Sequence, residues 1–229
     1  MTRLAAASDG HGGLTRNRQV NPQNTALLVI DVQHYCVYPG QGEWEHIEPK
    51  NVPADLVYYF DRIESTVLPN IARLQQACRK AGSEVMYTVI ESLTSDGRER
   101  GLDYKISGFL VPKESPWAKI PEDVKPLSDE IIIPKGSSSV FNSTNIDYIL
   151  RNLEVDYLVM SGLVTDQCVE TAVRDACDRG FLVTLVTDAC ATYSHERHEA
   201  SLQAIKGYCR QVKTEELIAE LEQLTDSPG

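Results

Sequence analysis

Continuous runs of apolar residues alternate with amphipathic stretches along most of the chain. A short apolar run is typical of a strand buried on both faces, and apolar residues three or four positions apart are typical of a helix packed on one side. Strands are predicted at residues 25–30, 84–90, 130–134, 156–161, 181–187 and 210–213. Helices are predicted at residues 58–81, 143–153, 166–179, 195–207 and 214–223. This alternation predicts an α/β fold, a three-layer α/β/α sandwich with a mostly parallel, Rossmann-like sheet of about six strands.

The ends of two predicted helices carry recognisable signals. Gly82 directly follows the helix predicted at residues 58–81 and is typical of the residue just after a helix end. Ser143 or Thr144 is suited to cap the helix predicted at residues 143–153.

Two connections, residues 34–57 and 91–129, are much longer than the few residues that usually join a strand to a helix. Ordered loops of this length usually carry function, so we expect them to set specificity. Residues 1–20 are polar and aperiodic, which predicts a flexible N-terminal arm. Residues 21–224 are predicted to form a single domain.

Composition narrows the class of protein. The chain has 229 residues, 42% of them apolar, which is enough for the core of one α/β domain. Its formal net charge of −11 argues against nucleic acid and anionic membranes as partners. No apolar stretch approaches the roughly 20 residues that span a bilayer, and residues 1–10 lack the apolar core of a signal peptide. We therefore expect a cytoplasmic protein.

The six cysteines are scattered and form no C-x-x-C pair, so neither a disulfide framework nor a zinc site is indicated. The five histidines are also scattered, and the spacing of His195 and His198 is more typical of surface positions on a helix start than of a metal pair. The sequence predicts no metal and no cofactor.

Cys168 is the strongest candidate for chemistry. An apolar strand ends at Ser161 and Gly162, and Thr165 or Asp166 is suited to begin the next helix, which places Cys168 in its first turn. The free N–H groups and the positive end of the helix dipole favour a thiolate there, so we expect a nucleophile of low pKa. The alternative is a small buried apolar residue, as many free cysteines are.

Two more strands end in ionisable side chains. Asp31 follows the apolar run at residues 25–30, and Lys135 follows the run at residues 130–134. Active sites of open α/β sheets form at the carboxyl edge of the strands, where these residues and Cys168 are expected to meet. An aspartate can take the thiol proton, and a nearby lysine favours the charged forms of both.

Three ordered motifs, at residues 28–33, 134–141 and 162–169, carry a resemblance to a known family. The likeness continues through residues 172–191 and covers roughly residues 23–212. The chain resembles the isochorismatase-like cysteine hydrolase superfamily, which includes nicotinamidases, N-carbamoylsarcosine amidases, ureidoacrylate amidohydrolases and biuret hydrolases.

The resemblance implies a catalytic triad of Asp31, Lys135 and Cys168. It also implies a cis peptide bond between Val164 and Thr165, and an oxyanion hole formed by the backbone N–H groups of Thr165 and Cys168. The expected reaction is cleavage of a C–N bond in a small amide or ureido compound through a thioester or thiocarbamate on Cys168. The family commonly forms oligomers, so a homodimer or homotetramer is expected.

Substrate recognition is assigned to side chains in or near the long connections. A small ureido compound is the preferred substrate, because hydrogen-bonding groups are more prominent there than a cage for an aromatic ring. The candidate substrate-binding residues are Gln33, Tyr35, Glu91, Tyr104, Lys105, Phe141 and Tyr193.

Three alternatives remain open at this point. Nicotinamidases carry Asp and His metal ligands after the second strand, and the absence of histidine at residues 89–96 argues against metal dependence and nicotinamide specificity. A non-catalytic binding or scaffold protein on the same fold would not need the three triad residues. A redox-active thiol protein would need a resolving cysteine. None is evident near Cys168 in sequence, although Cys36 or Cys190 could approach it in space.

Overall fold

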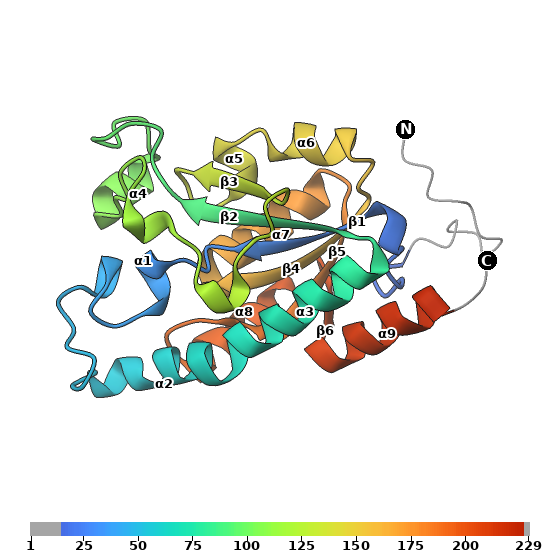
Figure 1. The fold of residues 1–229 in the computed structure, drawn as a ribbon, viewed down its shortest axis with the longest axis horizontal. Helices are drawn as coiled ribbons and strands as arrows, with labels where there is room; N and C mark the ends of the chain where they lie inside the picture. Colours follow the sequence, from blue (N-terminus) through green and yellow to red (C-terminus); the bar gives the residue numbers. More distant parts are fainter. Residues whose placement is uncertain (1–14, 227–229) are drawn as a thin grey trace.

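The computed structural model describes residues 15–226, which form one six-stranded sheet in which every pair of neighbouring strands is parallel (Figure 1). The strands lie in the order β3-β2-β1-β4-β5-β6. Their bounds are β1 Thr25–Ile30, β2 Glu84–Ile90, β3 Ile131–Lys135, β4 Tyr157–Leu163, β5 Leu182–Ala191 and β6 Arg210–Val212. The predicted α/β sandwich with a Rossmann-like parallel sheet is confirmed.

Helices cover both faces of this sheet. The α-helices are α1 His34–Val37, α2 Ala54–Arg62, α3 Leu68–Ala81, α4 Leu102–Ser107, α5 Val140–Ser143, α6 Ile146–Asn152, α7 Glu170–Asp178, α8 His195–Ile205 and α9 Thr214–Asp226. Two π-helical turns are η3 Ile63–Val67 and η6 Thr165–Val169, and four short 3₁₀ turns are η1 Pro22–Asn24, η2 Gly42–Trp44, η4 Pro116–Ala118 and η5 Glu122–Val124. No helix among these is long and apolar enough to cross a membrane.

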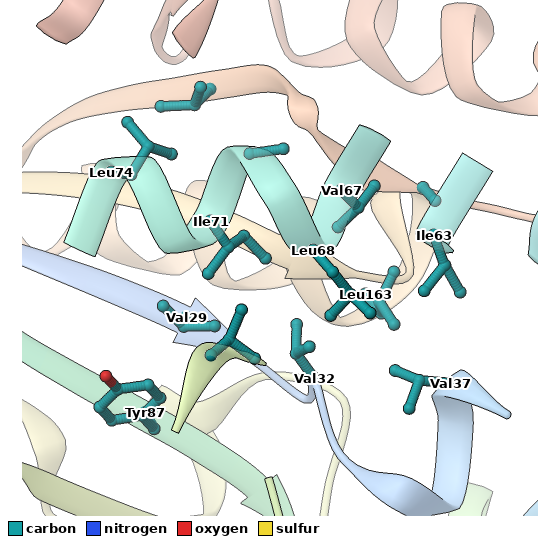
Figure 2. Close-up of a cluster of buried hydrophobic side chains, with 14 of the residues drawn as sticks. Val29, Val32, Val37, Ile63, Val67, Leu68, Ile71, Leu74, Tyr87 and Leu163 are labelled. Carbon is teal, nitrogen blue, oxygen red and sulfur yellow. The ribbon is translucent and has the colours of Figure 1, made fainter. Parts of the chain in front are cut away.

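The sheet separates two hydrophobic clusters, because successive side chains of a strand point to opposite faces. On β1, Leu27 and Val29 belong to the cluster under α3 and α9, whereas Leu28 belongs to the cluster under α5 to α8. Figure 2 shows the first cluster, with Ile71 and Leu74 of α3 above Val29. Strands buried on both faces explain why their sequences are continuous apolar runs rather than alternating ones.

The boundaries of several elements differ from the prediction. The helix predicted at residues 58–81 begins earlier, at Ala54, and runs through the π turn η3 into α3, ending at Gly82 in the expected left-handed conformation with φ of 76°. The strand predicted at residues 181–187 continues to Ala191, which brings its end to the edge of the sheet where the candidate chemistry lies.

The helix predicted at residues 143–153 is interrupted. Thr144 is extended, with φ of −139° and ψ of 174°, and it separates α5 from α6. Its hydroxyl accepts a hydrogen bond from the N–H of Ile146 at 3.1 Å, so the side chain competes with the helix backbone and starts a new helix instead.

Residues 1–14 of the predicted flexible arm lie outside the described residues. Within the remainder, Val20 is buried, and its N–H donates to Glu220 at 2.9 Å. Glu220 of α9 also pairs with Arg210 of β6. The packed part of the chain therefore includes Val20, just before the predicted domain boundary.

Gly162 fixes the approach of β4 to β1. It has φ of 120°, and a Cβ atom placed on it would lie 2.1 Å from the carbonyl oxygen of Ile30. Asp31 follows Ile30 directly, so any side chain at position 162 displaces the end of β1 that carries this carboxylate.

We predict that Gly162→Ala lowers the free energy of unfolding by about 3 kcal/mol or more, because backbone must move to relieve the clash. Gly180→Ala is the control, since Gly180 also has positive φ but has no atom within 4 Å of the added Cβ. Its expected cost is only about 1–2 kcal/mol. Urea unfolding of both variants measures the difference, and equal losses would contradict the steric explanation.

Candidate active site

The side chains of Asp31, Lys135 and Cys168 meet at the carboxyl edge of the sheet. Asp31 follows β1, Lys135 is the last residue of β3, and Cys168 lies in the π turn η6 after β4. Strand β2 separates β1 from β3, so the lysine must reach across it. The sequence-based prediction that these three residues come together agrees with their positions.

The ammonium group of Lys135 is the centre of the cluster. Its Nζ lies 2.8 Å from Asp31 Oδ2, and the two side chains are 0% and 1% exposed. It donates hydrogen bonds to the hydroxyl of Tyr104 and the carbonyl of Ser137, both at 2.8 Å, and lies 3.5 Å from Cys168 Sγ. A buried charge needs such complete pairing, so this lysine fixes the relative positions of its neighbours.

The backbone and β2 hold Asp31 in place. Its φ of 55° is unusual for a residue other than glycine, although aspartate tolerates it better than most. Its N–H donates to the carbonyl of Thr88 at 3.0 Å, and the Thr88 hydroxyl donates to Oδ1 at 2.8 Å. One carboxylate oxygen is thus oriented by β2, and the other faces Lys135.

Burial raises the pKa of Cys168 to about 12, which overturns the prediction of a low-pKa thiolate. Lys135 acts to lower this pKa, but burial outweighs it, and the charge of Asp31 raises it further. Burial alone would lower the pKa of Lys135, yet Asp31 and its other partners hold the net value well above the usual range. At rest the site therefore holds a neutral thiol beside a charged lysine.

A small pocket adjoins Cys168. It is lined by Asp31, Cys36, Glu43, Tyr59, Ile90, Tyr104, Phe109, Leu163, Val164, Gln167, Cys168 and Tyr193. Its volume of about 20 Å³ holds about one water molecule, so a substrate enters only when the surrounding side chains yield. A hollow of about 1020 Å³ lies at the opposite edge, near the starts of β5 and β6, and contains none of the triad.

Two predicted substrate-binding residues line this pocket. Tyr104 of α4 is buried and lies 3.7 Å from Cys168 Sγ through its hydroxyl. Tyr193 follows β5 and packs against Tyr59 and Trp44. Tyr104 therefore contacts Cys168 directly, which the sequence did not indicate.

The side chains of Gln33 and Glu91 form hydrogen bonds with backbone groups instead of lining the pocket. Gln33 is fully buried, donates to the carbonyls of Ile90 and Trp117 at 3.0 and 3.1 Å, and accepts the N–H of Ile90 at 2.6 Å. Glu91 accepts the N–H of Glu114 at 2.7 Å. Both shape the loops around the pocket and do not line it.

Three other predicted substrate-binding residues also lie outside the pocket lining. Tyr35 is buried behind Phe109, which does line it. Lys105 is exposed, because it lies next to Tyr104 on the short helix α4 and points to a different side. Phe141 belongs to the hydrophobic cluster under α5 to α8.

Several lining residues were not predicted from the sequence. Among the residues that line the pocket, Glu43 is the one carboxylate besides Asp31. It belongs to η2, within the long connection at residues 34–57 that was expected to be functional. No periodic signal distinguishes Glu43 from Glu45 in that segment, so only the folded loop identifies it.

The predicted position of the cis peptide bond is wrong by one residue. The cis bond joins Leu163 and Val164, because β4 extends to Leu163 and the helical turn begins at Thr165. Val164 and Cys168 line the pocket. Thr165 does not, and its hydroxyl hydrogen bonds to His198 at 2.9 Å.

Within residues 15–226, no three His, Cys, Asp or Glu side chains are grouped to hold a metal ion. His198 is buried against Thr165 and Arg62, and burial followed by the charge of Arg62 lowers its pKa to about 4. His195, three residues earlier, is exposed.

Comparison with known proteins places this site in a family. The isochorismatase domain model matches residues 25–216, so the chain belongs to the isochorismatase family, and the resemblance found in the motifs is confirmed. An N-carbamoylsarcosine amidase from Arthrobacter sp is 33% identical over 121 residues, which are 51% of this chain and 46% of that amidase. The chain thus matches less than half of that relative's length.

Two further relatives match over most of their lengths. Nicotinamidase 3 of Arabidopsis thaliana is 27% identical over 192 residues, covering 82% of this chain and 83% of that protein. The crystal structure of a cysteine hydrolase from Pseudomonas syringae pv. phaseolicola 1448A superimposes with a TM-score of 0.77 and 24% identity, covering 92% of this chain and 98% of that one. This structural likeness shows the fold.

We predict that Asp31→Asn lowers the pKa of the Cys168 thiol, because the charge and hydrogen bond that raise it are removed while Lys135 remains. The far-ultraviolet absorbance of the thiolate, followed against pH, reports the change. A Cys168→Ser variant gives the background from the other five cysteines. An unchanged or higher pKa would show that burial alone controls the thiol.

We predict that Lys135→Met lowers the free energy of unfolding by about 3–5 kcal/mol, because it leaves the Asp31 carboxylate buried without its partner. The double variant Asp31→Asn/Lys135→Met should recover much of this loss, since no unpaired charge remains. Arg98→Met is the control, because Arg98 pairs with Asp96 in an exposed ion pair that contributes little to stability. Additive losses in the double variant, measured by denaturant unfolding, would contradict the pairing argument.

Proposed function

We propose that this protein hydrolyses a C–N bond in a small amide or ureido compound, with Cys168 as the nucleophile. The single observation that carries the proposal is the position of Lys135 Nζ, which lies 2.8 Å from Asp31 Oδ2 and 3.5 Å from Cys168 Sγ beside a small pocket. A general base, a cation and a thiol are thus held together where a small carbonyl compound can bind.

The reaction begins with transfer of the Cys168 thiol proton to Asp31. The resulting thiolate attacks the carbonyl carbon, and the tetrahedral intermediate collapses as Asp31 returns the proton to the departing nitrogen. A thioester or thiocarbamate remains on Cys168. Asp31 then takes a proton from water, whose oxygen attacks the same carbon and releases the thiol.

Lys135 is proposed to make this proton transfer possible. The thiol of Cys168 has a raised pKa, so it ionises only when the negative charge that forms is stabilised. Before transfer the ammonium group is paired with the Asp31 carboxylate, and after transfer it lies beside the thiolate. The hydroxyl of Tyr104, which contacts both Lys135 and Cys168, can donate a hydrogen bond to the same sulfur.

The backbone N–H groups of Val164 and Cys168 are the proposed donors to the oxyanion, since both residues line the pocket. This revises the pair expected from the sequence by replacing Thr165 with Val164. The two N–H groups would stabilise the negative oxygen of the tetrahedral intermediate.

The buried charges argue against a non-catalytic binding protein. Removing Asp31 and Lys135 from water costs free energy that a well-packed apolar pair would not require. A scaffold gains nothing from that cost, whereas hydrolysis needs a base, a cation and a nucleophile in contact. The two amidases among the relatives support the same reaction type.

We predict that purified protein releases ammonia or an amine from at least one of biuret, an N-carbamoyl amino acid, an N-carbamoyl amide or nicotinamide. Cys168→Ser should lower the rate about a thousandfold or more, because the hydroxyl is a far weaker nucleophile in this site. Cys177→Ser is the matched control, since Cys177 lies at the opposite edge of the sheet.

Intact-mass measurement during turnover should show an adduct on wild-type protein and none on Cys168→Ser. Turnover by Cys168→Ser at the wild-type rate would contradict the proposal. Activity confined to nicotinamide would keep the nucleophile but replace the ureido substrate class.

A further inference from the structure

Glu43 is held at the pocket by its neighbours on both sides. Gly42 has φ of 51°, and a Cβ there would lie 2.4 Å from the Cα of Tyr35, so the loop packs tightly against the backbone. Trp44 is buried, and its indole N–H donates to the carbonyl of Cys36 at 3.0 Å. The backbone on both sides of Glu43 is therefore held by packing, which places Glu43 in the pocket lining.

The carboxylate of Glu43 is half-buried and has no hydrogen bond or ion pair with any residue among 15–226. Burial raises its pKa to about 7. Burying a carboxylate without a partner costs free energy in the unliganded protein. Such groups are typical of ligand-binding sites, where the ligand supplies the missing partner.

The pocket offers Glu43 no positive partner. Among the described residues that line it there is no lysine, arginine or histidine. Asp31 is the other lining carboxylate, and Lys135 already balances its charge. The remaining wall near Glu43 includes Tyr59 and Tyr193, which are neutral at ordinary pH because burial raises the pKa of each.

We infer that Glu43 selects the substrate by accepting hydrogen bonds from N–H groups on its unreacting part, so that the site takes neutral or cationic amides and ureides and rejects those bearing a carboxylate there. This inference rests on the proposed hydrolysis and names its substrate class. It gives no role to the predicted substrate-binding residue Lys105, since Lys105 is exposed and does not line the pocket.

Two ligands of nearly the same shape test the effect of a negative charge on the unreacting part of the substrate. N-carbamoylglycine ends in a carboxylate, and N-carbamoylglycinamide ends in an amide that donates N–H groups. Wild-type kcat/KM should favour the amide by about tenfold or more, because like charges repel in a partly desolvated site. Glu43→Gln keeps the size of the side chain and should bring the ratio of the two values close to one.

Glu45→Gln is the matched control, because Glu45 lies two residues away and is exposed. It should leave the ratio unchanged. The wild-type preference should also grow as pH rises through about 7, where Glu43 ionises, and Glu43→Gln should lack this change. The charge of Glu43 acts on Tyr35, Cys36, Tyr59 and Tyr193, whose raised pKa values keep them neutral there. Asp31, the other carboxylate in the pocket lining, is paired with Lys135 in both proteins.

Binding separates failure of this inference from failure of the proposed function. Calorimetric titration of both ligands into Cys168→Ser and into Cys168→Ser/Glu43→Gln needs no turnover. Tighter binding of the amide that depends on Glu43 supports the inference even if nothing is hydrolysed. Equal or tighter binding of N-carbamoylglycine to the Cys168→Ser protein overturns it, as does turnover whose substrate ratio is unaffected by Glu43→Gln.

Discussion

The buried ion pair between Lys135 and Asp31 is the constraint on which the site depends. Two opposite charges lie out of water between β1 and β3, at a separation of 2.8 Å. Such a pair is tolerated only when the remaining donors and acceptors are also satisfied. Thr88 of β2 and Tyr104 of α4 meet that requirement, so elements far apart in the sequence are tied to one point.

This pair also bears on the charge state of Cys168. Burial dominates the pKa of Cys168, and the nearby charge of Lys135 does not offset it. The lysine beside the sulfur therefore does not create a resting thiolate. In the proposed reaction it holds the base and the thiol close enough for a proton to move between them when a substrate arrives.

The strands and the meeting of Asp31, Lys135 and Cys168 were predictable because their signals are local. Each is a polar residue at or after the end of an apolar run, and parallel strands bring such ends to one edge. The pocket lining was less predictable. Whether Gln33 or Glu43 faces the pocket depends on how the long connection folds, and the positive φ of Gly42 and the anchoring of Trp44 leave no periodic trace in the sequence.

The same limit applies to the turn after β4 and to the helix break at Thr144. Hydrophobic periodicity indicates that a strand is followed by a helix, but it does not fix the residue at which the direction changes. The cis bond at Val164 and the hydrogen bond of the Thr144 hydroxyl are decided by local backbone geometry.

The burial and raised pKa of Cys168 affect how fast its thiol reacts with small electrophiles and oxidants. Peroxides and simple alkylating agents attack the thiolate, so a thiol of raised pKa is a slow target for both. Covalent inhibitors that depend on a preformed anion would gain little at Cys168. A compound that resembles the substrate would instead promote transfer of the Cys168 proton to Asp31 as it binds. The thiolate formed in this way would then react with the bound compound.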